Sequence, residues 1–284
     1  ATVGGHTDII QSAAWNPTGS LFATTCKDKK ARTFDPRSPD LNTWEAHEGT
    51  KGARVCWIDD GILATNGFSK MSERQYKFWD IRNTGKELHG ENIDTASGLM
   101  MPFYDADTTL FFLGGKGDGN IRYFEWVAEE KKAYFLTAYS SNIPQRGLCM
   151  GPKRGVAVSD WEVARFYKIH GDGKIVEPIQ FIVPRKSDIF QDDLYPDCYA
   201  GEPAQSADEY KAGGNPQAPK RSMAPGFVAK EKPTQEFKPV VKVDEGPKTE
   251  KELRDAFEKL KVHAAHLETE LKKKDARIAE LENK

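Results

Sequence analysis

A short motif recurs at a fixed interval in the first half of this chain. Residues 28–35, 73–80 and 118–125 align without gaps, so successive copies begin 45 residues apart. Each copy begins with an acid, has Arg or Lys four residues later, and ends with an aromatic residue and a second acid. An interval of about 40–45 residues with a Trp-Asp ending, as at Trp79-Asp80, is typical of one four-stranded blade of a β-propeller. The repeat therefore predicts a mainly β fold, a WD-repeat β-propeller.

The same alignment predicts a buried polar network in each blade. The first two copies follow a histidine, in Gly5-His6 and Ala46-His47, and a threonine lies between histidine and motif. Such a hydrogen-bonded chain is tolerated inside a blade when every member is satisfied, and it then fixes the register of the strands. The third copy has no matching histidine, so its network is incomplete. The residues with this structural role are His6, Thr24, Asp28, His47, Thr65, Glu73, Trp79 and Asp118.

The interval also allows the blades to be counted. A fourth, degenerate unit ends at Arg165 to Tyr167, with its base 43 residues after Arg122. Residues 1–175 then make about four blades, whereas propellers have about 4–8. A seven-bladed ring would need further blades upstream of Ala1, and half a ring would expose blade faces and strand edges. We therefore expect the chain to represent the later blades of a seven-bladed ring, with the N-terminal blades missing.

Composition divides the remaining chain into three segments. Residues 176–202 are expected to form an extension that packs on the propeller. Residues 203–247 hold 7 of the 16 prolines and few large apolar residues, which predicts an extended or partly disordered linker. Residues 248–284 contain no proline or glycine and are rich in Lys, Glu, Ala and Leu, which favours a single helix.

The predicted helix carries a heptad repeat. Apolar residues alternate at intervals of four and three, which are the a and d positions of a coiled coil. Thr249 and Glu252 have the spacing of a capping box at the start of the helix. An isolated helix of this length is marginal in water, so self-association is favoured over docking on the propeller of the same chain. The predicted oligomerisation residues are Leu253, Phe257, Leu260, Ala264, Leu267, Leu271, Lys274, Arg277, Ile278, Leu281 and Glu282.

The C-terminal end of the predicted helix indicates how many chains the coiled coil contains. Arg277 falls at a g position and Glu282 at the following e position, around the apolar Ile278 and Leu281. This arrangement resembles a trimerisation signature of short coiled coils, in which the Arg stem covers the apolar seam and its head pairs with a neighbouring glutamate. A parallel trimer is favoured over a dimer, and Lys274 at a d position helps to select the register.

The sequence offers little support for an enzyme. Residues 114–120, rich in glycine, lack the ending of a phosphate-binding loop and fit a hairpin turn. The repeat spacing of His6 and His47 marks them as structural rather than catalytic histidines. No nucleophile elbow, Cys-x-x-Cys pair or zinc-protease motif occurs, so we expect no catalytic site, cofactor or metal.

Charge and hydropathy exclude two further classes. A formal net charge of −2 argues against nucleic-acid binding, which requires a basic surplus or a basic face. No run of 18 apolar residues is present, so no transmembrane segment is expected. Four scattered cysteines fit a reducing, cytoplasmic compartment.

A basic cluster in the first blade is a candidate contact for an acidic partner. The competing interpretation is a solvated strand edge whose charges block pairing with another chain. The cluster consists of Lys27, Lys29, Lys30 and Arg32.

Several longer stretches resemble the coronins, a family of WD-repeat actin-binding proteins. The most specific is the run from Val183 to Asp197, followed by a proline-rich segment and a terminal heptad helix. The segments 69–75, 101–105, 115–124 and 144–147 also match, and residues 237–241 and 245–248 resemble the amoeboid coronins. The resemblance covers essentially the whole chain.

The resemblance implies a seven-bladed propeller that binds F-actin, engages the actin-nucleating complex of actin-related proteins, and forms a homo-oligomer through its coiled coil. It implies roles in filament bundling, branching, motility, phagocytosis and cytokinesis at the actin-rich cell cortex of the cytoplasm. Arg185 and Lys186 lie in the matched run and are candidate partner contacts, although the run, with Phe190 and Tyr195, could instead staple the underside of the propeller. The alternative function is a WD-repeat adaptor for a complex without actin.

Overall fold

The computed structural model describes residues 2, 4–38, 40–185, 189–229 and 249–282. The chain forms two units, residues 1–231 and residues 232–284, which we describe separately.

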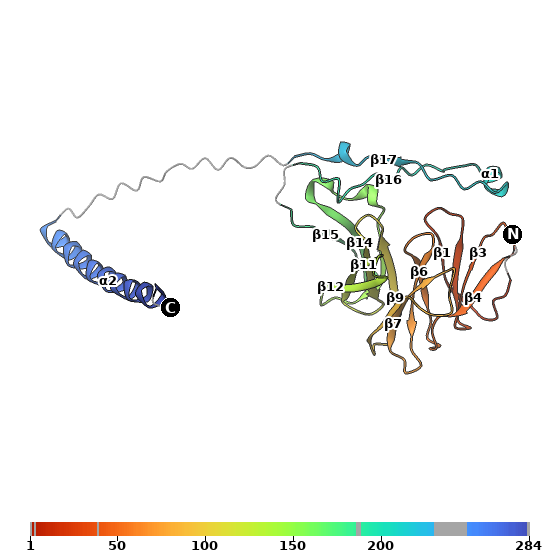
Figure 1. The fold of residues 1–284 in the computed structure, drawn as a ribbon, viewed down its shortest axis with the longest axis horizontal. Coiled ribbons are helices and arrows are strands. Elements are labelled where there is room, and N and C mark those ends of the chain that lie inside the picture. Colours follow the sequence, from red (N-terminus) through yellow and green to blue (C-terminus); the bar gives the residue numbers. More distant parts are fainter. Residues whose placement is uncertain (1, 3, 39, 186–188, 230–248, 283–284) are drawn as a thin grey trace. The chain divides into compact units, whose positions relative to one another are not determined.

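Three antiparallel sheets of four strands make up most of the first unit (Figure 1), and within each sheet the strands follow chain order. The first sheet contains β1 (Ile10–Trp15), β2 (Phe22–Cys26), β3 (Lys30–Phe34) and β4 (Leu41–Glu45). The second contains β5 (Arg54–Trp57), β6 (Ile62–Phe68), β7 (Arg74–Asp80) and β8 (His89–Asp94). The third contains β9 (Met100–Asp105), β10 (Leu110–Gly115), β11 (Asn120–Val127) and β12 (Lys132–Ser140). The repeated motif coincides with the third strand of each sheet, as a blade requires.

The last sheet corrects the placement of the fourth repeat. It contains three strands, β13 (Gln145–Met150), β14 (Glu162–His170) and β15 (Val176–Ile182). Arg165 to Tyr167 lie on β14, the second strand, and not on the third strand as predicted. The third strand is β15, which pairs with β14 from Val176 to Ile182. The predicted boundary at residue 175 is therefore wrong, because the last sheet continues to residue 182.

Aromatic residues fill the spaces between the sheets. Between the second and third sheets, Phe78 stacks on Trp126 with ring centroids 4.3 Å apart, and Tyr76 is fully buried beside them. Between the third and last sheets, Phe112 and Phe166 pack with centroids 5.0 Å apart. Two of the aromatic residues that end the motif also lie at such junctions. Trp79 is 5.9 Å from Trp44 of the first sheet, and Phe124 is 5.1 Å from Tyr76 of the second, measured between ring centroids.

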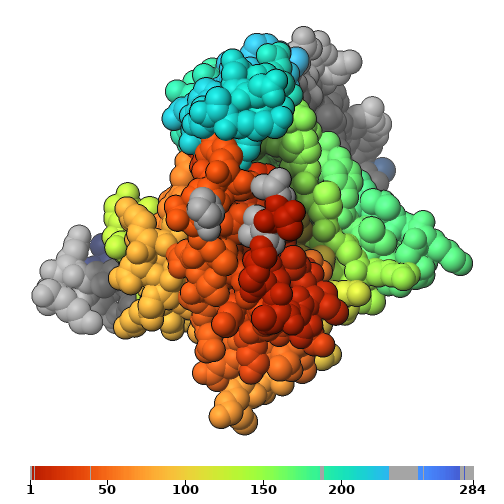
Figure 2. Space-filling view, turned by 90° about the vertical axis from the view of Figure 1, so that its right-hand side faces the viewer, coloured from red at the N-terminus to blue at the C-terminus, as the bar shows by residue number. Residues whose placement is uncertain are grey.

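The extension after β15 crosses the ends of the sheets. We call residues 189–229 the strap. It contains β16 (Cys198–Tyr199) paired with β17 (Lys220–Arg221), the short helix α1 (Ala207–Lys211) and a turn of 3₁₀-helix at Ala224–Gly226. Two further 3₁₀ turns, Lys153–Gly155 and Val158–Asp160, precede β14. In Figure 2 the strap, in cyan, lies against the first sheet, in red and orange.

The contact between the strap and the first sheet is centred on Arg37. Its guanidinium lies 4.4 Å from the ring centroid of Tyr210 and donates hydrogen bonds to the backbone oxygens of Gly214 (3.0 Å) and Tyr210 (3.4 Å). Residues 203–229 are therefore not the linker that their proline content predicted. Stacking and hydrogen bonds from a distant sheet hold them, and composition does not reveal such contacts. Residues 230–248 of the predicted linker lie outside the described residues.

The opposite end of the strap is anchored under β14. The hydroxyl of Tyr195 donates a hydrogen bond to the backbone oxygen of Glu162 (2.9 Å), and Tyr195 is 2 % exposed. Phe190 packs against Tyr195 with centroids 6.0 Å apart. The run after β15 thus staples the sheet through these two aromatic residues, as one of the two sequence interpretations expected.

The second unit contains α2 (Glu250–Glu282), a helix of 33 residues. Its first turn is closed by a hydrogen bond from the backbone N–H of Leu253 to the backbone oxygen of Thr249 (2.9 Å). The predicted capping partner, Glu252, has a side chain outside the described part of the structure.

Candidate functional site

The polar network of the first sheet is only partly the predicted one. The ring of His6 and the hydroxyl of Thr24 lie 2.9 Å apart, as expected. Asp28 instead accepts hydrogen bonds from the guanidinium of Arg32 and from the hydroxyl of Thr7 (3.2 Å). The bond from Arg32 is the main reason that the pKa of Asp28 is strongly lowered. Burial and the charge of Arg32 lower the pKa of His6.

The second sheet has a complete, buried network. Ring nitrogen Nε2 of His47 lies 2.9 Å from the Thr65 hydroxyl, which accepts a hydrogen bond of 2.8 Å from the indole N–H of Trp79. Gln75 donates to the other ring nitrogen of His47 at 2.9 Å. Burial, with a smaller contribution from Lys77, lowers the pKa of His47 to about 3, so the imidazole is neutral. Gly67 is required beside it, because a Cβ atom there would lie 2.6 Å from the His47 ring.

One member of this network was assigned wrongly from the sequence. Glu73 does not contact His47; its carboxylate instead accepts hydrogen bonds from Ser69 (3.1 Å) and Asn92 (2.9 Å). Gln75 takes the place beside the histidine. The motif contains both residues, and only the path of the chain from the turn into β7 shows which one points inward.

The third sheet lacks the histidine, and its motif takes part in a network of ion pairs instead. The buried guanidinium of Arg74, from β7, lies 2.6 Å from Asp94 and 2.8 Å from Asp118. Arg122 also contacts Asp94, at 2.9 Å. Asp118 is thus structural, as predicted, although its partners belong to an ion-pair network that joins the second and third sheets. The sequence shows Arg74 within the motif, but Asp94 lies in β8, where the repeat carries no signature.

We call the turns between the second and third strands of the sheets the lysine rim. Every such turn carries exposed lysine: Lys29 in the first sheet, Lys70 in the second, Lys116 in the third and Lys174 in the last. Because antiparallel strands alternate in direction, these four turns share one edge of their sheets. The acids of the first and third turns, Asp28 and Asp118, are held by arginines, as described above. No ion pair involves the rim lysines within the described parts of the chain.

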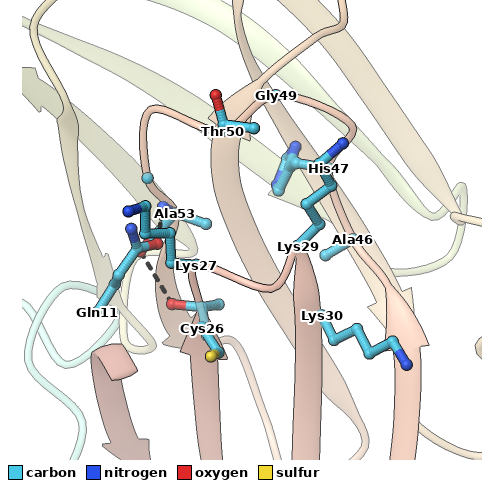
Figure 3. Close-up of a pocket in the computed structure, with 12 residues that line it drawn as sticks. Gln11, Cys26, Lys27, Lys29, Lys30, Ala46, His47, Gly49, Thr50 and Ala53 are labelled. Atoms are coloured by element: carbon cyan, nitrogen blue, oxygen red, sulfur yellow. Dashed lines mark hydrogen bonds between the residues drawn. The ribbon is translucent and has the colours of Figure 1, made fainter. Parts of the chain in front are cut away.

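Figure 3 shows a part of this rim beside His47, with Lys27 and Lys29 at the opening of a hollow. The hollow has a volume of about 10 Å³, which is room for about one water molecule. The hollow is therefore too small to hold an organic ligand.

The four residues of the predicted basic cluster do not share one role. Lys27, Lys29 and Lys30 are exposed. Arg32 is 2 % exposed and is occupied by Asp28 and by the backbone oxygen of Gly5. Arg32 is therefore a structural residue, and its assignment as a partner contact was wrong.

The second pair of predicted contacts lies near the strap. Arg185 forms an ion pair of 2.6 Å with Asp193, an exposed residue of the strap. Lys186 lies outside the described residues.

The helix α2 exposes the apolar positions of its heptads. Leu260 is 68 % exposed and Leu271 is 64 % exposed, and Ala264 and Lys274 are exposed as well. The remaining described positions of this seam, Leu253, Phe257, Leu267 and Ile278, are each more than half exposed. The side chains of Arg277, Leu281 and Glu282 lie outside the described part of the structure, and the predicted trimer signature is left as a sequence pattern.

No group of three or more His, Cys, Asp or Glu side chains is arranged to hold a metal ion in the described ranges. None of the described helices combines the length and the apolar character needed to cross a bilayer.

Comparison with known proteins places this arrangement in a class. A model of one type of WD40 repeat matches residues 176–218, which span β15 and much of the strap. The crystal structure of the WD40 domain of a coronin from Toxoplasma gondii superimposes with a TM-score of 0.72 and 36% sequence identity. That match covers 76% of this chain and 56% of the other. The sheets are therefore those of a WD40 β-propeller.

A curated relative extends the match to almost the whole chain. Coronin-A of Dictyostelium discoideum is 52% identical over 283 residues, which are 99% of this chain and 63% of coronin-A. The chain is thus a homologue of coronin-A, as the sequence resemblance indicated, and it spans less than two thirds of the length of that relative.

Proposed function

We propose that this chain acts as an actin-associated, non-enzymatic scaffold, with the propeller sheets binding F-actin and α2 joining copies of the chain. The observation that carries this proposal is the sequence identity of 52% to coronin-A, which extends over 99% of the chain. Filament bundling, regulation of the actin-nucleating complex of actin-related proteins, and location at the actin-rich cortex belong to the same proposal. So does the inference that further blades complete the ring.

The lysine rim is the surface that we assign to actin within the described residues. Lys27, Lys29 and Lys30 are exposed and unpaired there, while their neighbouring acid Asp28 is neutralised by Arg32. A cluster of exposed cations attracts an acidic partner and accelerates association, with an effect that declines as salt rises. The exposed lysines Lys27, Lys29 and Lys30 therefore support contact with an acidic protein surface, one of the two interpretations that the sequence allows.

The seam of α2 supports the oligomeric part of the proposal. Leucine side chains that are more than half exposed along 33 residues favour burial in a coiled coil. A parallel trimer is proposed over a dimer on the pattern around Ile278. Linking three weak actin contacts raises the effective concentration of each, which converts weak binding into bundling.

Cosedimentation with actin filaments tests the proposal. Lys27→Glu with Lys29→Glu should weaken pelleting several-fold at low salt. Lys86→Glu with Lys211→Glu makes the same charge change at exposed lysines away from the rim and should leave pelleting unchanged. If the unsubstituted chain fails to pellet at low salt, the account of actin binding is wrong and an adaptor for another complex becomes the better explanation.

A further inference from the structure

A cavity of about 940 Å³ lies under the strap. Its floor is formed by the hairpins that follow the first strands of three sheets: residues 16–19 after β1, residues 104–107 after β9 and residues 150–153 after β13. Its roof is formed by strap residues 197–199 and 217–220. Sites for small ligands in proteins have volumes of about 300–1,000 Å³, so this cavity has the size of a binding site.

One side of the cavity is apolar. Met150, Val156 and Val163 line it from the last sheet, and Cys198 and Ala218 line it from the strap. These side chains offer no strong hydrogen-bonding group. They suit the hydrocarbon part of a ligand rather than a purely polar one.

The other side carries charges that are unevenly satisfied. The amine of Lys153 lies 2.6 Å from Asp105 and donates a second hydrogen bond to the backbone oxygen of Val163 at 2.9 Å. Thr108 donates a further hydrogen bond to Asp105 at 2.6 Å. The Asp107 carboxylate is 3.9 Å from the same amine, too far for a hydrogen bond. No described residue donates a hydrogen bond to this carboxylate.

The electrostatic state of Asp107 agrees with this geometry. Burial is the main cause of its raised pKa, and the charge of Asp105 adds to it, whereas Lys153 and Lys220 act in the opposite direction. Loss of water and a neighbouring carboxylate both disfavour the ionised form. A cation placed beside Asp107 would relieve both effects.

We propose that the cavity binds an organic cation with an aliphatic body, such as the amine or guanidinium of a lysine-like or arginine-like side chain. The cationic group pairs with the Asp107 carboxylate, and the hydrocarbon chain lies along Met150 and Val163. This site is separate from the lysine rim, because the first-to-second and second-to-third turns lie at opposite ends of the strands. It does not depend on the proposal about actin.

Agmatine, a four-carbon chain with a guanidinium at one end and an ammonium at the other, is a direct probe. We expect agmatine to bind the chain saturably at neutral pH. Isothermal titration calorimetry or amide chemical shifts in NMR would measure this binding. Hexanoate, which has a comparable chain and the opposite charge, should not bind. Asp107→Asn should weaken agmatine binding about tenfold, because it removes the charge from the hydrogen bond that the carboxylate accepts. Glu129→Gln removes an exposed carboxylate outside the cavity and should change nothing.

A second variant keeps the test independent of Asp107. Ala218→Trp projects an indole from the strap into the cavity and should abolish agmatine binding without changing the thermal melt. The proposal is overturned if agmatine shows no saturable binding. It is also overturned if hexanoate binds as well as agmatine, or if both the Asp107 and Ala218 variants bind agmatine as the original chain does.

Discussion

The propeller sheets and α2 are both built from repeats, but only the sheets bury the apolar residues of their repeats within the chain. In the sheets, aromatic residues of neighbouring blades pack against each other, so Phe78 and Trp126 are 0 % and 3 % exposed. In α2, the apolar residue of each heptad is left open, as at Leu260 and Leu271. A repeat of 45 residues finds its neighbour within the chain, whereas a heptad repeat needs a second helix. The difference supports the proposal that the helix, and not the sheets, joins copies of the chain.

The largest expected effect follows from breaking the seam of α2. Leu260→Asp with Leu267→Asp places charges at two d positions, where they would be buried in a coiled coil at high cost. Sedimentation equilibrium should show the mass falling from about three times to one times the 31.8 kDa of a single chain.

The matched control for the seam is Ala265→Asp with Thr269→Asp, which adds the same charge on the outer face of α2. It should leave the mass unchanged. A seam variant that keeps the oligomeric mass would show that the helix is not the site of assembly. The melting temperature of the sheets should be the same in both variants, because the two repeats act independently.

The next largest effect concerns the interior of the sheets. Arg74→Met leaves Asp94 and Asp118 facing each other without the buried cation that separates them, and breaking such a pair costs about 3–5 kcal/mol. Urea unfolding should show that loss of stability.

Arg82→Met is the control for this substitution. It removes an exposed arginine paired with Asp80 and should cost less than about 1 kcal/mol. Equal costs at the two positions would contradict a structural role for the ion-pair network between the second and third sheets.

The pH dependence of folding tests His47. Its folded pKa of about 3 lies below the ordinary value of 6.5, so the unfolded chain binds the proton more readily. Stability from the neutral ring is complete above 6.5 and is lost as pH falls toward 3. One such group changes the free energy of unfolding by up to about 1.4 kcal/mol per pH unit.

His47→Gln should lower the number of protons taken up on unfolding by about one between pH 6 and pH 4. This number is read from the slope of the free energy of unfolding against pH. The other histidines with lowered pKa, His6 and His89, are present in both chains and cancel in the comparison. An unchanged slope would mean that His47 is not buried as a neutral ring.

The smallest expected effect is the difference in stability between variants of the polar networks in the first two sheets. Thr65→Val deprives both His47 and Trp79 of a hydrogen-bonding partner, and such a buried group costs about 1–3 kcal/mol. Thr24→Val affects His6 alone, which water reaches, so it should cost less than about 1 kcal/mol. Thermal unfolding of the two variants should rank them in this order. The reverse order would show that the network of the second sheet is not the stronger one.

The same contrast explains what could be predicted from the sequence. The motif predicts one blade for each of its copies, and the copies fall on β3, β7 and β11; its spacing predicts the contacts His6–Thr24 and His47–Thr65. β15 was missed because its residues, Val176 to Ile182, carry no copy of the motif. The strap was missed because Arg37 and Tyr210 are far apart in sequence and their stacking leaves no local pattern.

The choice between neighbouring residues was also beyond the sequence. Glu73 and Gln75 are both polar and lie two residues apart, and β7 turns the glutamine rather than the acid toward His47. Arg32 resembles a surface residue because it follows three exposed lysines, yet β3 is buried from Ala31 to Phe34 and Arg32 pairs with Asp28.

Low-speed cosedimentation of actin filaments tests the central claim that a propeller for binding is joined to a helix for assembly. The chain should bring bundled filaments into the low-speed pellet. The same chain lacking residues 249–284 should still bind filaments at high speed but leave them in the low-speed supernatant. Equal bundling with and without α2 would contradict the account.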